Sequence, residues 1–277
     1  MKDIIFPALA MGALGLVLGA MLAIASKIFA VKKDERAQAI SEILPGANCG
    51  SCGYAGCSAY AAAISGEGAK INACNPGGQS VSDAIAQIMG VESAQVEEKC
   101  AVVRCNGTQG VAADKYIYEG VADCSAAAAL QGGGQKACEY GCLGFGNCAA
   151  ACRNGAITVQ DGIAVVDTDK CGACGECVAA CPKNLIEIVA KSKKYIVKCQ
   201  SCDKGADMKA KCSVGCIGCK ICEKNCPADA IKIENNHAVI NDDKCIGCGI
   251  CKEKCPKKII MTVVKEEKPV ETYSKEN

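Results

Sequence analysis

The chain begins with a long apolar run. Ile4 to Ser26 is 23 residues without a charged side chain, which as a helix would be roughly 35 Å long at about 1.5 Å per residue. Four basic residues follow within ten positions: Lys27, Lys32, Lys33 and Arg36. We therefore expect a single N-terminal transmembrane helix in residues 1–31. Because positive charge follows it, we expect the rest of the chain on the cytoplasmic side of the inner membrane.

A cleaved signal peptide is the alternative interpretation of this run, because Ala23-Ile24-Ala25 resembles a cleavage site. The run is too long for a signal peptide, and its basic residues follow the apolar part instead of preceding it. Gly15 and Gly19 form a G-x-x-x-G step, at which a second membrane helix could approach closely.

Short segments with helical periodicity come next. They are DERAQAISEIL, SAYAAAIS from Ser58, and residues 80–99. In the last segment the apolar positions share one helix face: Val81, Ala84, Ile85, Ile88 and Met89. We expect a small α-rich module over residues 32–99.

Farther along, apolar and polar residues alternate with a period of two. AITV…IAVVD after Cys152 and AIKI…HAVIN after Cys226 each predict two short strands joined by a turn. His237, the one histidine of the chain, is expected to lie in such a turn and face solvent. A C-x2-C-x2-C-x3-C-P run follows each hairpin, so the C-terminal half contains an internal repeat.

The cysteine content indicates that these elements bind metal. The chain has 26 cysteines among 277 residues, mostly in groups of four with gaps of two or three residues. Partners so close cannot easily form disulfides with one another, but they can surround a metal centre. Reduced thiols indicate a cytosolic setting. Aromatic residues are few, so we expect inorganic clusters to supply local folding energy in place of large apolar cores.

The spacing C-x2-C-x2-C-x3-C-P is the signature of bacterial two-cluster ferredoxins, in which the fourth cysteine binds the other run's cluster. Such runs begin at Cys171, Cys216 and Cys245. An irregular run precedes them, with the spacing C-x3-C-x5-C-x3-C: Cys138, Cys142, Cys148 and Cys152. We align its first two cysteines with Cys216 and Cys219, which leaves four extra residues in its gaps. Arg153 stands where the regular runs have proline.

The fold class expected is therefore α+β, with the transmembrane helix, the α-rich module and two tandem ferredoxin units at 138–190 and 216–264. A connecting segment (100–137), a basic linker (191–215) and a flexible tail (265–277) complete the domain organisation. Swapped ligation predicts four 4Fe-4S clusters, with these ligand sets: Cys138, Cys142, Cys148 and Cys181; Cys152, Cys171, Cys174 and Cys177; Cys216, Cys219, Cys222 and Cys255; Cys226, Cys245, Cys248 and Cys251.

A fifth 4Fe-4S cluster is expected in the α-rich module, on Cys49, Cys52, Cys57 and Cys74, with zinc as the alternative metal. Six cysteines remain: Cys100, Cys105, Cys124, Cys199, Cys202 and Cys212. Four of them could bind a sixth cluster, or they could be free buried thiols, because cysteine packs well as a small hydrophobe.

Charge is unevenly distributed. Residues 34–98 hold eight acidic residues against two basic ones, a net charge of −6, and residues 190–225 hold nine lysines against three acidic residues, a net charge of +6. A solvated surface is the simpler interpretation of the basic stretch; a docking surface for a small acidic electron carrier is the more specific one.

Catalytic motifs are missing from the sequence. Gly144-x-Gly146 lies between cysteines instead of after a strand, so it is no dinucleotide fingerprint. No acid–base pair or nucleophile is evident, and neither an NAD nor a flavin site nor a nucleic-acid-binding role is expected. One-electron transfer by the clusters is the chemistry implied.

The apolar N-terminus, CGSCGYAGC followed by INACNPGG, then YGCLGFGNC and the two ferredoxin runs, together resemble the B subunit of the Rnf complex, the bacterial ion-translocating ferredoxin:NAD oxidoreductase. The resemblance covers all but the last residues. It implies a membrane-anchored subunit that takes electrons from soluble ferredoxin and relays them to the other Rnf subunits, where NAD reduction is coupled to export of Na+ or H+.

Two other classes of protein remain open from the residues. One is the electron-transfer subunit of another membrane oxidoreductase, of hydrogenase or formate dehydrogenase type. The other is a membrane-tethered zinc-binding interaction protein without a redox role.

Overall fold

The computed structural model describes residues 2–28 and 34–263, so the predicted tail lies outside the described residues. Its first element is helix α1 (Lys2–Ile28), 27 residues long. The exposure of its side chains is described for residues 11–24, and Leu16 and Leu22 among them are exposed. Within the described part of the chain, no helix is both long and apolar enough to cross a membrane.

Three helices form the N-terminal module: α2 (Glu35–Ile43), α3 (Cys57–Glu67) and α4 (Gly78–Met89). Asp34 caps α2 by accepting a hydrogen bond from the Arg36 amide, as expected of an aspartate at a helix N-terminus. The apolar faces of the three helices meet in one buried core that contains Ile40, Tyr60 and Ile85. This core positions the loops that carry Cys49, Cys52 and Cys74 and the first residue of α3, Cys57.

Residues 99–190, hereafter unit 1, form two antiparallel two-stranded sheets. One pairs β1 (Lys99–Val103) with β4 (Ile186–Ala190), and the other is a hairpin of β2 (Ile157–Gln160) and β3 (Ile163–Val166). Three short helices accompany the sheets: α5 (Cys124–Ala128), α6 (Asn147–Ala150) and α7 (Glu176–Ala179). Strand β1 thus completes unit 1 from within the predicted module and connecting segment.

Residues 194–263, hereafter unit 2, repeat this arrangement. Strand β5 (Tyr195–Val197) pairs with β8 (Ile260–Thr262), and β6 (Ile231–Glu234) forms a hairpin with β7 (His237–Ile240). The helices are α8 (Gly205–Lys211), α9 (Ile221–Lys224) and α10 (Ile250–Lys254). The segment predicted as a basic linker therefore contributes a strand and a helix to the folded unit.

His237 differs from its prediction, because it begins β7 and is only 8 % exposed. The turn consists of Asn235 and Asn236, both with positive φ, which is the pairing that a tight two-residue hairpin favours. Burial lowers the pKa of His237.

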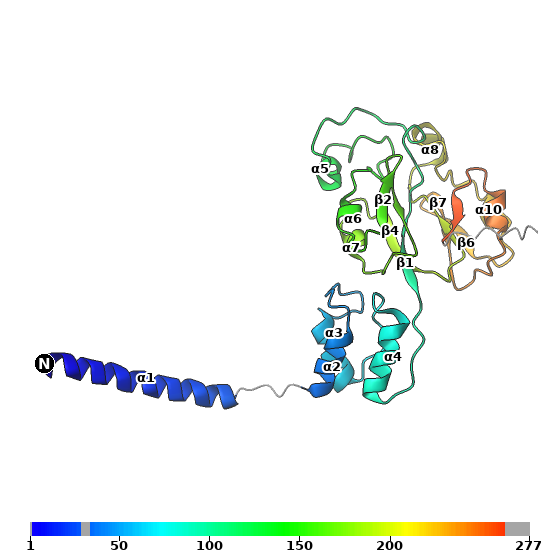
Figure 1. Ribbon diagram of the computed structural model, residues 1–277. Coiled ribbons are helices and arrows are strands. Elements are labelled where there is room, and N and C mark those ends of the chain that lie inside the picture. Colours follow the sequence, from blue (N-terminus) through cyan, green and yellow to red (C-terminus); the bar gives the residue numbers. More distant parts are fainter. Residues whose placement is uncertain (1, 29–33, 264–277) are drawn as a thin grey trace, which may run out of the picture.

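Units 1 and 2 lie side by side, with the three-helix module joined to them through β1 (Figure 1). Cys100, Val102 and Val189 of unit 1 pack with Ile196 and Val263 of unit 2 in one buried cluster. The two units therefore share an apolar contact in addition to the chain that links them.

Candidate metal centres

The two units match residue for residue over most of their length. Cys142, Cys148 and Cys152 each lie 74 residues before Cys216, Cys222 and Cys226, with no insertion between them. Gly144 and Gly218 obey the same offset, and both have positive φ. A Cβ at Gly144 would lie 2.5 Å from the Gly162 carbonyl oxygen in the β2–β3 turn. Only glycine permits that approach.

This match differs from the predicted alignment. Cys138 corresponds to Cys212, not to Cys216, and Cys142 corresponds to Cys216. The position equivalent to Cys219 is Phe145. The irregular run therefore has no extra residues; it lacks one cysteine.

In unit 2 the structure brings together the cysteines of both predicted ligand sets. One cavity of about 340 Å³ is lined by Cys216, Cys219, Cys222 and Cys255, and another of about 310 Å³ by Cys226, Cys245, Cys248 and Cys251. Burial raises the pKa of the Cys222 thiol to about 12 and that of Cys251 to about 11, and neighbouring thiols of the same set contribute.

In unit 1 one predicted set also comes together. Burial raises the pKa of the Cys177 thiol to about 12, and the next contributions come from nearby thiols, those of Cys171, Cys174, Cys148 and Cys152. Cys171 and Cys152 accept hydrogen bonds from the amides of Ala101 and Ala156, both at 3.3 Å. Unit 2 has the equivalent of the second bond, from Ala230 to Cys226 at 3.3 Å.

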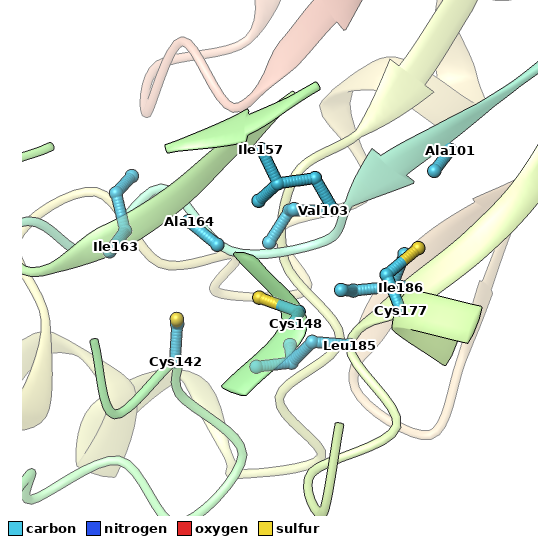
Figure 2. Close-up of a cluster of buried hydrophobic side chains, with 10 residues drawn as sticks. All are labelled: Ala101, Val103, Cys142, Cys148, Ile157, Ile163, Ala164, Cys177, Leu185 and Ile186. Atoms are coloured by element: carbon cyan, nitrogen blue, oxygen red, sulfur yellow. The ribbon is translucent and has the colours of Figure 1, made fainter. Parts of the chain in front are cut away.

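The other set of unit 1 contains a different cysteine from the one predicted. A cavity of about 400 Å³ is lined by Cys124, Cys142, Cys148 and Cys181, whereas Cys138 lines a separate cavity. Figure 2 shows Cys142 and Cys148 below Ala164 in the buried core, with Leu185 next to Cys148. Burial raises the pKa of the Cys148 thiol to about 11, and three thiols contribute next: Cys142, Cys181 and Cys124.

Helix α5 places Cys124 in that cavity. The Asn147 side chain accepts a hydrogen bond from the Cys124 amide at 2.8 Å and donates one to Asp123 at 2.6 Å. Asp123 also caps α5 by accepting from the Ala126 amide. Phe145 packs against Tyr118 of the preceding loop, with ring centroids 5.1 Å apart. The loop that supplies Cys124 is thus fixed at the point where unit 1 lacks its cysteine.

The N-terminal module groups Cys49, Cys52, Cys57 and Cys74 as predicted from the sequence. Burial raises the pKa of the Cys74 thiol, and the other three thiols contribute. Asn48 accepts a hydrogen bond from the Cys57 amide at 2.8 Å. The Tyr60 hydroxyl donates to the Lys70 carbonyl at 2.6 Å and accepts from the Ala73 amide at 3.1 Å, which fixes the loop that leads to Cys74.

Arg153 joins this module to unit 1. It forms an ion pair with Glu176 at 2.7 Å and donates a hydrogen bond to the Ala47 carbonyl at 3.1 Å. Cys49 and Cys174 line one shared open cavity. The residue that replaces proline therefore bridges the two cysteine-bearing loops.

Of the six cysteines left unassigned by sequence, four line the cavities between and within the units. Cys124 is in unit 1's cavity, and Cys105, Cys199 and Cys212 line a further cavity together with Cys138. Cys100 is fully buried among apolar residues, and Cys202 is half-buried with its thiol directed to the Gln200 carbonyl.

The donor sets fit iron–sulfur clusters. Among the described residues, no three Cys, His, Asp or Glu side chains converge closely enough to hold a single metal ion; four sulfurs on one zinc ion must lie within roughly 4 Å of one another. In units 1 and 2, four thiols instead surround each of four cavities of 310 to 400 Å³. Amide N–H groups directed at the sulfurs are typical of such sites.

Comparison with known families supports this assignment along the chain. Residues 44–76 match the family described as "Putative Fe-S cluster", residues 164–187 the "4Fe-4S binding domain", and residues 215–260 the "4Fe-4S dicluster domain". The first match contains all four cysteines of the N-terminal module.

Whole-length relatives decide the family. The chain is 44% identical over 245 residues to the B subunit of the Na+-translocating ferredoxin:NAD+ oxidoreductase complex of Acetobacterium woodii, covering 88% of this chain and 73% of the relative. It belongs to the family of Rnf complex B subunits. Similar relatives are the B subunit of the ion-translocating oxidoreductase complex of Methanosarcina acetivorans (43%, covering 83% of this chain and 88% of the relative) and that of the proton-translocating ferredoxin:NAD+ oxidoreductase complex of Clostridium ljungdahlii (41%, covering 87% and 85%).

Proposed function

We propose that this Rnf subunit accepts electrons from reduced ferredoxin in the cytoplasm and passes them to the other subunits of the complex, where NAD reduction is coupled to export of Na+ or H+. Its family and its 4Fe-4S domains make it an electron-transfer subunit. The observation that supports the proposal best is the succession of four-cysteine groups along the N-terminal module, unit 1 and unit 2.

Five groups are proposed as 4Fe-4S ligands on this basis. They are Cys49, Cys52, Cys57 and Cys74; Cys152, Cys171, Cys174 and Cys177; Cys124, Cys142, Cys148 and Cys181; Cys216, Cys219, Cys222 and Cys255; and Cys226, Cys245, Cys248 and Cys251. The clusters supply reversible one-electron transfer when bound.

The rest of the chain prepares these sites. Backbone amides donate to the sulfurs of Cys152, Cys181 and Cys226, which stabilises the thiolate charge. Apolar side chains such as Ile157 and Leu185 pack around the cysteines and exclude water. The thiols with raised pKa bind metal as thiolates, so cluster insertion must release protons.

We also propose that the uncharged run from Ile4 to Ser26 anchors the chain in the inner membrane as a single span, with the cluster-bearing units on the cytoplasmic side. This proposal goes beyond the structure, in whose described residues no helix meets the length and apolarity of a span. Support comes from the 27-residue length of α1, the exposed apolar side chains over residues 11–24 and the basic residues that follow. Removing residues 2–31 should release the protein from membranes washed with carbonate. Retention of the truncated chain by membranes that lack the other Rnf subunits would contradict this.

The basic stretch is partly committed to structure. Lys191 pairs with Glu98, Lys193 with Asp242, and Lys211 with Asp203. The exposed lysines of the stretch are Lys194, Lys204, Lys209, Lys220 and Lys224. We propose the first three, which lie within residues 191–211, as contacts for acidic ferredoxin.

Rapid mixing with reduced ferredoxin tests this surface. Replacing Lys194, Lys204 and Lys209 by Gln should slow second-order electron uptake and weaken its dependence on ionic strength. Lys70→Gln, at an exposed lysine of the acidic N-terminal module, is the matched control. It should change neither the rate of electron uptake nor its dependence on ionic strength. Equal rates in the triple variant and the control would exclude this surface.

The experiment that tests the function as a whole is a membrane assay. Deleting the gene should abolish ferredoxin-dependent NAD reduction by membranes, and a wild-type copy should restore it. Unaltered NAD reduction in the deletion strain would refute the assignment.

A further inference from the structure

We propose that a sixth iron–sulfur cluster lies between the two units, bound by Cys105 and Cys138 of unit 1 and by Cys199 and Cys212 of unit 2. This inference extends the proposed function, on which it rests for the class of cofactor. It differs from the sequence-based expectation because Cys138 leaves its predicted set and joins three of the six unassigned cysteines.

The backbone brings these four residues together. Cys105 and Cys199 are direct partners in an antiparallel bridge between the units, so their side chains leave the backbone on the same side. A second bridge joins Ala112 to Cys212, flanked by hydrogen bonds from the Ala113 amide to the Lys211 carbonyl at 2.9 Å and from the Ser213 amide to the Val111 carbonyl at 3.1 Å. All four cysteines line one cavity of about 360 Å³. Four cysteines likewise line each of the three cavities formed by proposed cluster ligands.

The four cysteines are two equivalent pairs. Cys138 lies 74 residues before Cys212, and Cys105 and Cys199 each come two residues after the last residue of β1 or β5. The Cys142 amide donates to the Cys105 sulfur at 3.4 Å, and the equivalent Cys216 amide donates to the Cys199 sulfur at 3.4 Å. Each unit thus contributes the same half of a site, and the halves face each other across the interface.

The charge of the cavity lining favours an anionic occupant. Three basic side chains line it with the cysteines: Arg104, Lys136 and Lys198. Lys136 is only 5 % exposed and donates to two backbone carbonyls, those of Gly107 at 2.6 Å and Gly162 at 3.2 Å, but to no carboxylate. The Nε atom of Arg104 is buried without a hydrogen-bond partner, although its Nη1 atom lies 3.4 Å from Glu187.

Buried cations are costly unless an opposite charge lies nearby. Asp203, whose charge acts on the Cys138 thiol, is already paired with Lys211 at 3.0 Å. A cluster held by four thiolates carries net negative charge and would compensate Lys136 and Lys198, which form no ion pair among the described residues, whereas Arg104 already pairs with Glu187. Four neutral thiols would not.

The test is iron and sulfide analysis of the full chain, purified without oxygen from a host that assembles clusters. Six clusters predict about 24 iron atoms per chain and five predict about 20. Cys199→Ala and Cys212→Ala should each lose about 4 iron atoms. Cys202→Ala, at a half-buried neighbour outside the cavity, should lose none.

The iron content of the wild-type chain distinguishes five clusters from six without any variant. The test therefore holds even if a variant folds poorly. About 20 iron atoms in the wild type, with no loss in Cys199→Ala or Cys212→Ala, would overturn the sixth cluster alone. A Cys105–Cys199 disulfide, or zinc bound in place of iron in this cavity, would also overturn it. A wild type without iron would instead refute the proposed electron-transfer function.

Discussion

Units 1 and 2 have the same strand pairing, the same hairpin and an equivalent glycine at Gly144 and Gly218, yet their equivalent cavities are lined by cysteines from different positions. Unit 2 supplies Cys219 from within its cysteine run, whereas unit 1 has Phe145 at that position and brings in Cys124 from the start of the preceding helix α5. The comparison teaches that a four-cysteine lining can be retained while one of its cysteines comes from a different place in the sequence.

A second difference follows from what each unit touches. After the fourth cysteine of the run, unit 2 has Pro227, which is exposed, and unit 1 has Arg153, which reaches Glu176 and the Ala47 carbonyl of the N-terminal module. Unit 1 contacts both the N-terminal module and unit 2, whereas the cysteine-bearing neighbour of unit 2 is unit 1. The residues that break the repeat are therefore those that connect unit 1 to the rest of the chain.

Removing iron should have the largest effect on stability, and it should destabilise units 1 and 2 more than the N-terminal module. In both units, cysteines are among the buried residues of the hydrophobic core, for example Cys148 and Cys222. In the N-terminal module, the buried core residues are apolar and the cysteines that contact them are only partly buried. Metal sites contribute on the order of 10 kcal/mol to small domains, comparable with their whole stability.

We expect chelation under oxidising conditions to unfold units 1 and 2 while part of the α2–α4 helix signal persists in circular dichroism. Limited proteolysis should then cut units 1 and 2 before the module. A fold that survives iron loss intact in both units would contradict the role given to the clusters.

Core truncation should have a smaller and equal effect on the two units. Leu185 and Ile259 each lie four residues after the last cysteine of their run, and both are 2 % exposed. Replacing either with Ala should cost about 2–5 kcal/mol, measured as a lower urea midpoint of the cluster-loaded chain. A lower urea midpoint in only one of the two variants would show that the two units do not depend equally on this core position.

Arg153→Pro, which gives unit 1 the residue of unit 2, should have the smallest effect on stability. Arg153 is mostly exposed, and its ion pair is worth below about 1 kcal/mol. Faster hydrogen exchange at residues 46–51 with an unchanged urea midpoint is the expected result. Glu176→Gln is the control that removes the ion pair and keeps the bond to Ala47, so it should have less effect on exchange. Unchanged exchange in Arg153→Pro would rule out the bridge.

Periodicity and spacing predicted the local elements well. The helical segments appear as α2, α3 and α4, but the helix predicted over residues 80–99 ends at Met89, where Gly90 caps it with positive φ, and Lys99 begins strand β1. The alternating segments appear as the hairpins β2–β3 and β6–β7. Pairing between distant strands was not predictable in this way. Lys99 faces Ala190 across the β1–β4 sheet, and nothing in either short apolar segment specifies a partner so far along the chain.

Cys138 was predicted in one set with Cys142, Cys148 and Cys181 because the first cysteines of the two runs were matched and four extra residues were accepted, whereas in the structure it lines another cavity. The constant offset of 74 already placed Cys142 on Cys216 and Phe145 on Cys219, so it would have revealed a missing ligand. It would not have identified Cys124, because residues 106–137 show no periodic pattern that fixes their path.

Moving the ligand tests the central claim most directly. Cys124→Ala should lose one cluster, about 4 iron atoms per chain, and adding Phe145→Cys in the same chain should restore it, since unit 1 would then have the cysteine that unit 2 has at Cys219. Full iron content in Cys124→Ala alone, or a double variant that remains deficient while its fold is intact, would contradict the account.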